Sequence, residues 1–415
     1  MRSVGVFREQ LLTLLHVGAE LEHALCCQYL FAAFSLKRRV DEGLSWPELE
    51  MVREWGASLL KVARQEMEHL GYACNLITAL GGTPSFEHQN FPYGRHYWPT
   101  HLTFELIPFS VEALRQFVEY ERPLGVQDEF STRPPARYED VRLEGLAGGD
   151  LEFEAVGEVY HHLRGMLADC PYPDRALFIG PQRAQIDNET LGNDRRGYAG
   201  VNVQPVRDLK SALAAVDQII EEGEGSTQAC PDGHYQVLID ILRELVSRGP
   251  DFAPARPVAR NPALRAGVLG EGTIRVTDPF SAGVLELFEG AYELMLIMLY
   301  RFVTHQDETD EEMAFLQRMA FFPLMTQIVR PLGELLTELP VGPEHPGLRA
   351  GASFERPRIS VVSSHREAAW TVMRERFHDL GLRCAELCAQ RPDLDRLQLL
   401  GSNLKRLAML SEAPC

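Results

Sequence analysis

An uninterrupted α-helical pattern runs from residue 8 to residue 37. Its seam of small, apolar and aromatic side chains, spaced four and three apart, holds one carboxylate: Leu15, Ala19, Glu22, Cys26, Tyr29 and Ala33. Burying a carboxylate there is costly unless a cation balances it. The pattern therefore predicts a long core helix in which Glu22 meets a metal ion or an arginine of a neighbouring helix. Glu20 competes with Glu22, because it forms a Glu-x-x-His pair with His23 on a less apolar stripe.

A second long helix is predicted over residues 47–80, with Pro47 in its first turn and Gly81-Gly82 after its end. It contains the Glu-x-x-His pair Glu66 and His69. Side chains three positions apart share one helix face, so both can bind one metal ion. In di-iron carboxylate bundles, two helices supply such pairs and two more each supply a glutamate. The same spacing is also common on solvated helix faces. Whether this pair binds metal therefore depends on whether other helices supply further ligands.

Two further segments complete a predicted four-helix set. Residues 151–168 form the third helix, in which Glu158 lies on a face of mixed polarity. Residues 207–248 form the fourth, which the segment GEGSTQACPDG interrupts. Glu224 and His234 flank this interruption, so a broken helix can bring them together as ligands. Glu221 is the alternative to Glu224.

Residues 83–110 are rich in aromatic residues and proline and predict a connecting loop. Its histidines, His88, His96 and His101, have no helical or zinc-finger spacing. We interpret them as packing or pocket-lining residues rather than metal ligands. A short helix is predicted over residues 111–121.

The C-terminal part of the chain continues the helical pattern. Two apolar helices are predicted within 280–339, and a last pair around Gly401 within 363–412. The proline-rich segment 249–262 reads as a linker or strap. We predict a bundle domain over 1–250 and a helical extension over 251–415 that packs on it, because segment 284–303 is too apolar for one exposed face.

Composition excludes several classes of partner. The chain has 59 acidic and 41 basic residues and a formal charge of −18, which argues against nucleic acid or an anionic membrane as its partner. Three glutamates in segment 284–303 argue against a membrane span. Eight cysteines without a Cys-x-x-Cys pair, and an N-terminus without a signal peptide, indicate a cytoplasmic protein with reduced thiols.

Four blocks occur in a fixed order: ELEHALCCQYLFAAFSL, QEMEHLGYACNLITALGGTP, VGEVY and EEGEGS followed by HY. Together they resemble the ferritin-like domain of the violacein and chromopyrrolate synthase group, whose standalone relatives are often labelled iminophenyl-pyruvate dimer synthase-like. The resemblance covers residues 8–250 and extends more weakly to about 355, whereas 356–415 match nothing that we can place. It implies an all-α fold: a ferritin-like four-helix bundle with additional C-terminal helices and long connecting loops.

The resemblance also places the metal ligands at the positions favoured by the residues themselves: Glu22, Glu66, His69, Glu158, Glu224 and His234. Such oxygen and nitrogen ligands suit two divalent ions, with iron expected first and manganese second. The large synthases of the group use a much longer chain with haem to couple two amino-acid-derived imines. Because this chain is far shorter, we expect neither haem nor that coupling reaction to carry over.

Two functions of different classes follow. The first is a non-haem dimetal oxidase or oxygenase, expected to be di-iron, that uses O2 on a small amino-acid-derived or aromatic substrate in specialised metabolism. The second is a metal-free ferritin-like scaffold or partner protein, in which the glutamates and histidines form a buried salt-bridge network. Iron storage is disfavoured by the large additions to the bundle. A small molecule is the expected partner, and a homodimer is compatible with the sequence.

Overall fold

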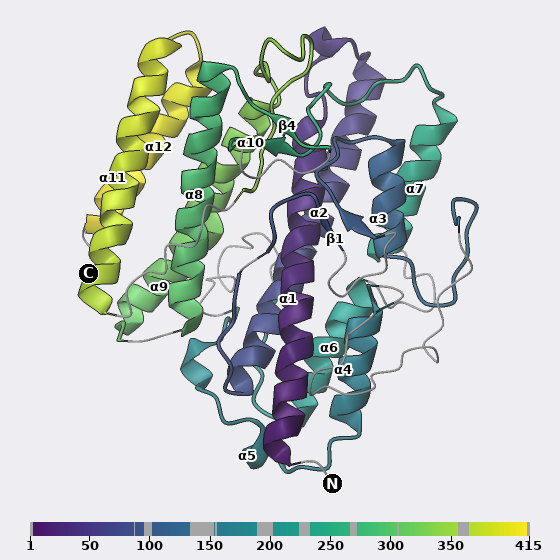
Figure 1. Cartoon of the computed structure of the whole chain (residues 1–415), viewed down its shortest axis with the longest axis vertical. Coiled ribbons are helices and arrows are strands. Elements are labelled where there is room, and N and C mark those ends of the chain that lie inside the picture. The colour runs from purple at the N-terminus through teal and green to yellow at the C-terminus, as the bar shows by residue number, and fades with distance from the viewer. Residues whose placement is uncertain are drawn as a thin grey trace. The chain divides into compact units, whose positions relative to one another are not determined.

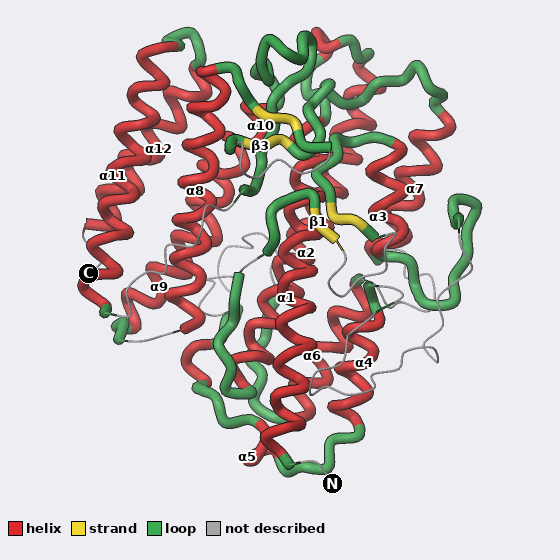
Figure 2. The backbone as a smooth tube through the Cα atoms, in the orientation of Figure 1, coloured by secondary structure: helices red, strands yellow, loops and turns green. Residues whose placement is uncertain are grey.

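The computed structural model describes residues 3–86, 88–94, 102–132, 153, 156–188, 202–223, 233–265, 272–304, 307–355 and 365–412. Nearly all of their regular structure is helical, which confirms the predicted all-α fold (Figures 1 and 2). The chain divides into two compact units. The N-terminal unit comprises Met1–Gln89, Tyr93–Asn188 and Asn193–Pro254, and the C-terminal unit comprises Asn90–Pro92, Glu189–Gly192 and Ala255–Cys415. Packing of the C-terminal helices on the bundle stays a prediction.

Two long helices, α1 (Val4–Ser35) and α2 (Trp46–Ala79), pack against each other in the N-terminal unit. The Ser3 side chain caps α1 by accepting a hydrogen bond from the Val6 amide. Ser45 and Glu48 form a capping box at the start of α2, with Pro47 in the first turn. These start signals explain why both helices begin within a few residues of the predicted positions.

Four shorter helices complete the bundle: α3 (Val111–Tyr120), α4 (Glu158–Ala168), α6 (Leu209–Glu222) and α7 (His234–Ser247). Helix α3 packs on α7 and α4 packs on α6, while α6 and α7 both contact α2. Figure 1 shows the α3–α7 pair and the α4–α6 pair toward opposite ends of the unit. Two long helices are thus accompanied by two pairs of short ones. Smaller elements join them: α5 (Asp174–Leu177) and the two-stranded sheet of β1 (Tyr93–Gly94) and β2 (Thr103–Phe104).

The ends of the short helices carry polar residues into the middle of the bundle. Helix α4 begins at Glu158 and not at residue 151 as predicted, while the break between α6 and α7 falls where the GEGSTQACPDG segment predicts it. Glu121 follows the last residue of α3, Glu222 is the last residue of α6, and His234 is the first of α7. Helix ends therefore supply polar side chains at several points of the bundle interior.

The C-terminal unit is a second helical assembly. Its elements are α8 (Pro279–Thr304), α9 (Asp310–Met319), the π-helical stretch η5 (Ala320–Val329), α10 (Arg330–Leu336), α11 (Arg366–Gln390), α12 (Asp395–Glu412), β3 (Pro262–Ala263) and β4 (Ile274–Arg275). Helix α8 packs on η5 and α11, and α11 packs on α12.

The turn of the last helical pair lies at 391–394, so its predicted position at Gly401 was wrong. Gly401 lies inside α12, where an added Cβ would come within 3.4 Å of Cys384 Sγ on α11. That is an ordinary van der Waals distance, so this glycine marks neither a turn nor an unusually close approach of the two helices. Among the described residues, no helix is both long enough and apolar enough to cross a membrane.

Candidate metal centre

Glu66 lies at the centre of a buried cluster of carboxylates and imidazoles. Its Oε2 atom is 3.2 Å from His69 Nδ1, one helical turn further along α2. Its Oε1 atom is 3.0 Å from His234 Nδ1, at the start of α7. The two oxygens of one carboxylate thus face two histidines from different helices.

Each histidine also faces a second carboxylate. Glu22 Oε2 on α1 is 3.4 Å from His69 Nδ1, and Glu121 Oε2 is 3.4 Å from His234 Nδ1. The side chains form two groups, Glu22–Glu66–His69 and Glu66–Glu121–His234, in each of which one ligand atom per residue lies within 4.8 Å of the others. Glu66 belongs to both groups. Two groups that share one carboxylate, and that each have a further glutamate and a histidine of their own, would suit two metal ions.

A fourth carboxylate contacts the cluster from α6. Glu222 Oε2 is 3.6 Å from His69 Nε2, and its side chain is 26% exposed. The other five cluster residues are at most 1% exposed. The centre is therefore sealed on most sides, with Glu222 on its more accessible side.

The electrostatics of the cluster follow from its burial. Burial and the nearby Glu66 carboxylate raise the pKa of Glu22 to about 8. Burial alone would also raise the pKa of Glu66, but His234 and His69 hold that pKa well below its usual range. Burial would lower the pKa of His234, whereas Glu66 and Glu121 raise it to about 9. Without metal, paired charges thus stabilise the ionised Glu66, while Glu22 favours its neutral form.

The donor set fits two divalent ions. Within the part of the chain that the structure describes, Glu22 Oε1 and His234 Nε2 are buried and make no hydrogen bond. Unsatisfied buried polar atoms are rare in folded proteins, and a bound ion is one way to satisfy them. The Tyr29 hydroxyl donates a hydrogen bond to Glu121 Oε1, which orients the other oxygen of Glu121 toward His234.

A sequence model of the ferritin-like family matches residues 15–243, which include every member of this cluster and more than half of the chain. The chain belongs to the ferritin-like family. The predicted family resemblance is confirmed, and the fold with its two ligand groups indicates a site for two metal ions.

Two proteins of known name are similar to this chain in sequence. Dichlorochromopyrrolate synthase of Lentzea aerocolonigenes is 27% identical over 93% of this chain and 40% of its own length. The 2-imino-3-(indol-3-yl)propanoate dimerase of Chromobacterium violaceum is 28% identical over 81% of this chain and 33% of its own length. The ferritin-like chain thus spans less than half of either relative. A solved ferritin-like protein from Caulobacter vibrioides, 19% identical, covers 75% of this chain and 93% of that one with a TM-score of 0.47.

The structure brings four of the six sequence-predicted ligands of this ferritin-like protein together: Glu22, Glu66, His69 and His234. Glu158 is fully buried at the start of α4, but among the described residues it belongs to neither ligand group, so its role stays a prediction. Glu224 lies outside the described residues. Glu22 contacts His69, whereas Glu20 belongs to no ligand group among the described residues. On α6, Glu222 contacts His69, a contact that the sequence did not predict, and the alternative Glu221 is exposed. The prediction of Glu224 stays untested.

Sequence reasoning missed Glu121 as a candidate ligand. The signal was the same one that revealed Glu22: Leu114, Phe117 and Glu121 are spaced three and four apart, and all three are buried. The helix is short and ends here, so its apolar stripe is too brief to single out one carboxylate.

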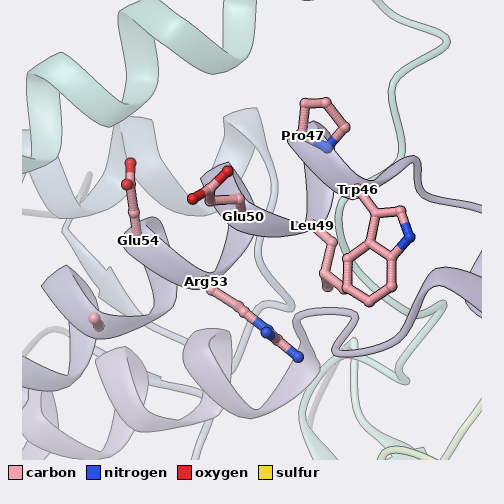
Figure 3. Close-up of a pocket in the computed structure, with 7 residues that line it drawn as sticks. Trp46, Pro47, Leu49, Glu50, Arg53 and Glu54 are labelled. Atoms are coloured by element: carbon pink, nitrogen blue, oxygen red, sulfur yellow. The ribbon is translucent and has the colours of Figure 1, made fainter.

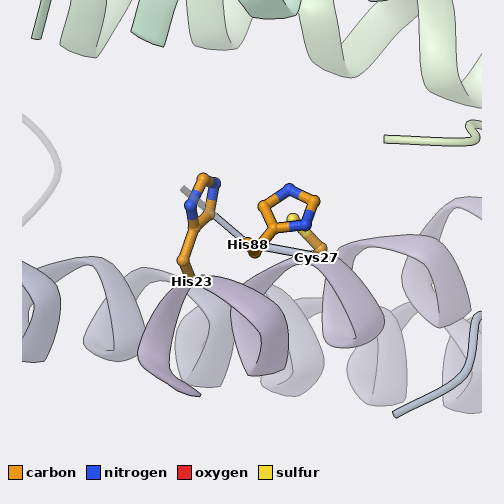
Figure 4. Close-up of side chains that lie close together, drawn as sticks. All are labelled: His23, Cys27 and His88. Carbon is orange, nitrogen blue, oxygen red and sulfur yellow. The ribbon is translucent and has the colours of Figure 1, made fainter. Parts of the chain in front are cut away.

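Two other features of the N-terminal unit are separate from this centre. Figure 3 shows a surface hollow in the first turns of α2, lined by Trp46, Pro47, Leu49, Glu50, Arg53, Glu54 and Ala57. Ala57 precedes Glu66 by nine residues, about 14 Å along the helix, so this hollow does not open on the cluster. His23, Cys27 and His88 form a third group of potential ligands (Figure 4), which differs from the interpretation of His88 as a packing residue.

Proposed function

We propose that this chain is a non-haem dimetal enzyme that uses O2 to oxidise a small amino-acid-derived or aromatic substrate. The observation that carries the proposal is the position of Glu66, whose oxygens face His69 at 3.2 Å and His234 at 3.0 Å. A carboxylate that belongs to two Glu–His groups could serve two ions at once. Oxygen and imidazole ligands without sulfur suit iron or manganese.

Charge balance supports two divalent ions. Glu22, Glu66, Glu121 and Glu222 supply four negative charges when ionised, which equal the four positive charges of two such ions. The two histidines complete the ligand set as neutral imidazoles. Carboxylates this close would otherwise repel one another in a low-dielectric interior.

Bound iron or manganese would supply the redox step with O2. The chain itself has three tasks. Glu22 and His69 would hold one ion, Glu121 and His234 would hold the other, and Glu66, which belongs to both ligand groups, would contribute to both. Tyr29 orients Glu121 through its hydroxyl, and Glu222 borders the less buried side, where we place substrate entry.

The substrate class rests on the relatives. The name of one relative specifies an imino acid that carries an indole ring, and the name of the other specifies a chromopyrrolate product. The first of these names describes an aromatic compound of the amino-acid type, and we propose a substrate of that class here. The dimerisation itself is not proposed, because the chain spans only 40% and 33% of those proteins.

The first experiment measures metal content and O2 consumption of the full chain purified from iron-supplemented cells. We expect close to two iron or manganese ions per chain, a magnetic signature of coupled ions, and oxygen uptake with an indole-containing amino acid or imino acid. His69→Ala should lower metal content and abolish uptake, while His162→Ala on α4 should do neither. A wild-type protein without metal, or a fully active His69→Ala variant, would refute the proposal.

The alternative, a metal-free scaffold, has one specific observation in its favour. Glu66 is already paired with two histidines, and those contacts hold its pKa low without any ion. In that case His69→Ala should lower the melting temperature by several degrees while the wild type binds no iron or manganese. The same preparations therefore separate the two functions.

A further inference from the structure

We propose that His23, Cys27 and His88 form a second metal site, distinct from the Glu66 centre, that binds one zinc-class transition-metal ion. The proposal goes beyond the dimetal function and does not depend on it. Figure 4 shows the three side chains gathered together, two of them from the same helix. One ligand atom of each lies within 4.8 Å of the others.

The backbone of two elements sets this geometry. His23 and Cys27 are four residues apart on α1, so their side chains lie on the same face one turn apart. His88 comes from the segment after α2 and meets them from outside the helix. The exposed fractions of His23, Cys27 and His88 are 5%, 2% and 8%. A soft sulfur donor and two imidazoles are thus held together away from solvent.

The hydrogen bond of His88 defines which of its ring nitrogens carries the proton. His88 Nδ1 is 2.7 Å from the backbone carbonyl oxygen of Gln89. Because a carbonyl oxygen only accepts hydrogen bonds, Nδ1 carries the proton and Nε2 carries a lone pair. Metal-binding histidines characteristically donate their other ring N–H to a carbonyl or carboxylate in this way. His88 is therefore in the tautomer that a ligand requires.

The two imidazole rings lie in edge-to-face contact, so an ion bound by both would need them to turn. Their centroids are 4.7 Å apart and their planes meet at 89°. With zinc–nitrogen distances of about 2.0–2.1 Å and a zinc–sulfur distance of about 2.3 Å, ligand atoms of one tetrahedral ion lie roughly 3.3–3.7 Å apart. Small side-chain rotations close a group that already lies within 4.8 Å.

The site differs from the Glu66 centre in position and in chemistry. Glu22 and His23 are consecutive on α1 and so point about 100° apart around the helix. Glu22 faces His69, whereas His23 faces His88. Thiolate favours zinc or copper over the hard ions preferred by carboxylates. On binding, the Cys27 thiol gives up its proton and the thiolate sulfur bonds the ion, so one proton is released per ion and no oxidant is needed.

The Cys27 thiolate and two neutral imidazoles supply three ligands. A zinc ion has four positions in its usual tetrahedral geometry. The fourth position is available to water or to a small ligand. The competing arrangement is an edge-to-face pair of imidazoles that packs on a thiol without an ion.

The test titrates the full-length protein with Co2+, which replaces zinc and produces a thiolate-to-metal charge-transfer band when sulfur is a ligand. We expect a band that saturates at one equivalent. Cys27→Ser and His88→Ala should each remove it or weaken cobalt affinity at least tenfold, while circular dichroism stays unchanged. Cys74→Ser is the matched control, because Cys74 is buried on α2 and, among the described residues, belongs to no ligand group. Its band should match that of the wild type.

A second measurement needs no variant. X-ray absorption at the zinc edge of the zinc-loaded wild type, with iron in the Glu66 centre, should show one sulfur and two imidazoles around zinc. Absence of the cobalt band in the wild type, its persistence in Cys27→Ser, or a zinc shell without sulfur would each overturn the site in favour of simple packing. His69→Ala keeps the band if the two sites are independent, so failure of the dimetal function and failure of this site give different results.

Discussion

Glu66 Oε1 lies 3.0 Å from His234 Nδ1, a contact that joins the middle of a continuous helix to the first residue of a short one. Both side chains are almost completely buried. The other oxygen of Glu66 faces His69, so a single carboxylate links both halves of the candidate centre. Its replacement should therefore disturb both ion positions together.

Glu66→Gln keeps the shape of the side chain and removes its charge. We expect metal content to fall at both positions, because a neutral amide is a poor bridge between two divalent ions. Glu222→Gln is the matched control, because Glu222 makes a more exposed contact with the cluster. We expect it to lose less metal than Glu66→Gln. Elemental analysis of both variants, alongside the wild type, measures the effect. Loss of only one ion in Glu66→Gln would show that Glu66 does not bridge.

Tyr29→Phe removes the hydroxyl that donates a hydrogen bond to Glu121. We expect metal affinity to fall by roughly 10-fold, the lower end of the range for outer partners of metal ligands. Tyr120→Phe is the control, since Tyr120 is also buried but contacts the Thr103 carbonyl at 2.5 Å. Competition with a chelator measures both affinities. Equal losses in the two variants would assign the effect to packing.

Glu121→Gln and Glu158→Gln compare two glutamates that are both 0% exposed. Only Glu121 lies in a ligand group within the described part of the chain, so Glu121→Gln should lower metal content more. If Glu158 is also a ligand, as the sequence suggests, the two variants should lose metal equally. Elemental analysis decides between these outcomes.

In the C-terminal unit, Glu289 should make stability depend on pH. Burial, together with the nearby Glu355, raises the pKa of Glu289 to about 8, against the effect of the Ser353 hydrogen bond. A raised carboxyl pKa means that the folded state keeps a proton that the unfolded state loses. The free energy of unfolding should therefore fall as pH rises from about 4.5 to about 8.

Glu289→Gln removes this titration, so its melting temperature relative to that of the wild type should be higher at pH 8 than at pH 5. Glu286→Gln, at a 59% exposed side chain on the same helix, should show no such trend. Thermal unfolding of all three proteins at the two pH values checks the prediction. Parallel curves for Glu289→Gln and the wild type would contradict it.

The sequence predicted the parts of the centre that depend on local periodicity. Glu22 stands out as the only carboxylate on a long apolar seam, and Glu66 and His69 are one turn apart on one helix. His234 follows a recognisable helix break. Glu121 depends instead on the packing of α3 on α7, which brings together residues distant in sequence. Its own helix is too short to reveal the face that becomes buried.

The contact of Glu222 with His69, beside an exposed Glu221, had a different cause. Where a helix ends, one residue more or less rotates a side chain by about 100°, so the register of the last turn decides which glutamate reaches the centre. His88 lies in a segment without periodicity, and nothing in its spacing places it beside α1. In each case the missing information is tertiary packing rather than composition.

The bundle consists of two continuous helices and four short ones. The ligands of the centre therefore come from two sides, one set by long helices and one set by helix ends. Glu22, Glu66 and His69 stand on α1 and α2, whose regular hydrogen-bonded backbones set their spacing. Glu121, Glu222 and His234 stand at helix ends, where the length of a connection can change without altering any helix. Changes in these connections can therefore alter the space for a substrate in related proteins, while α1 and α2 keep Glu66 in place.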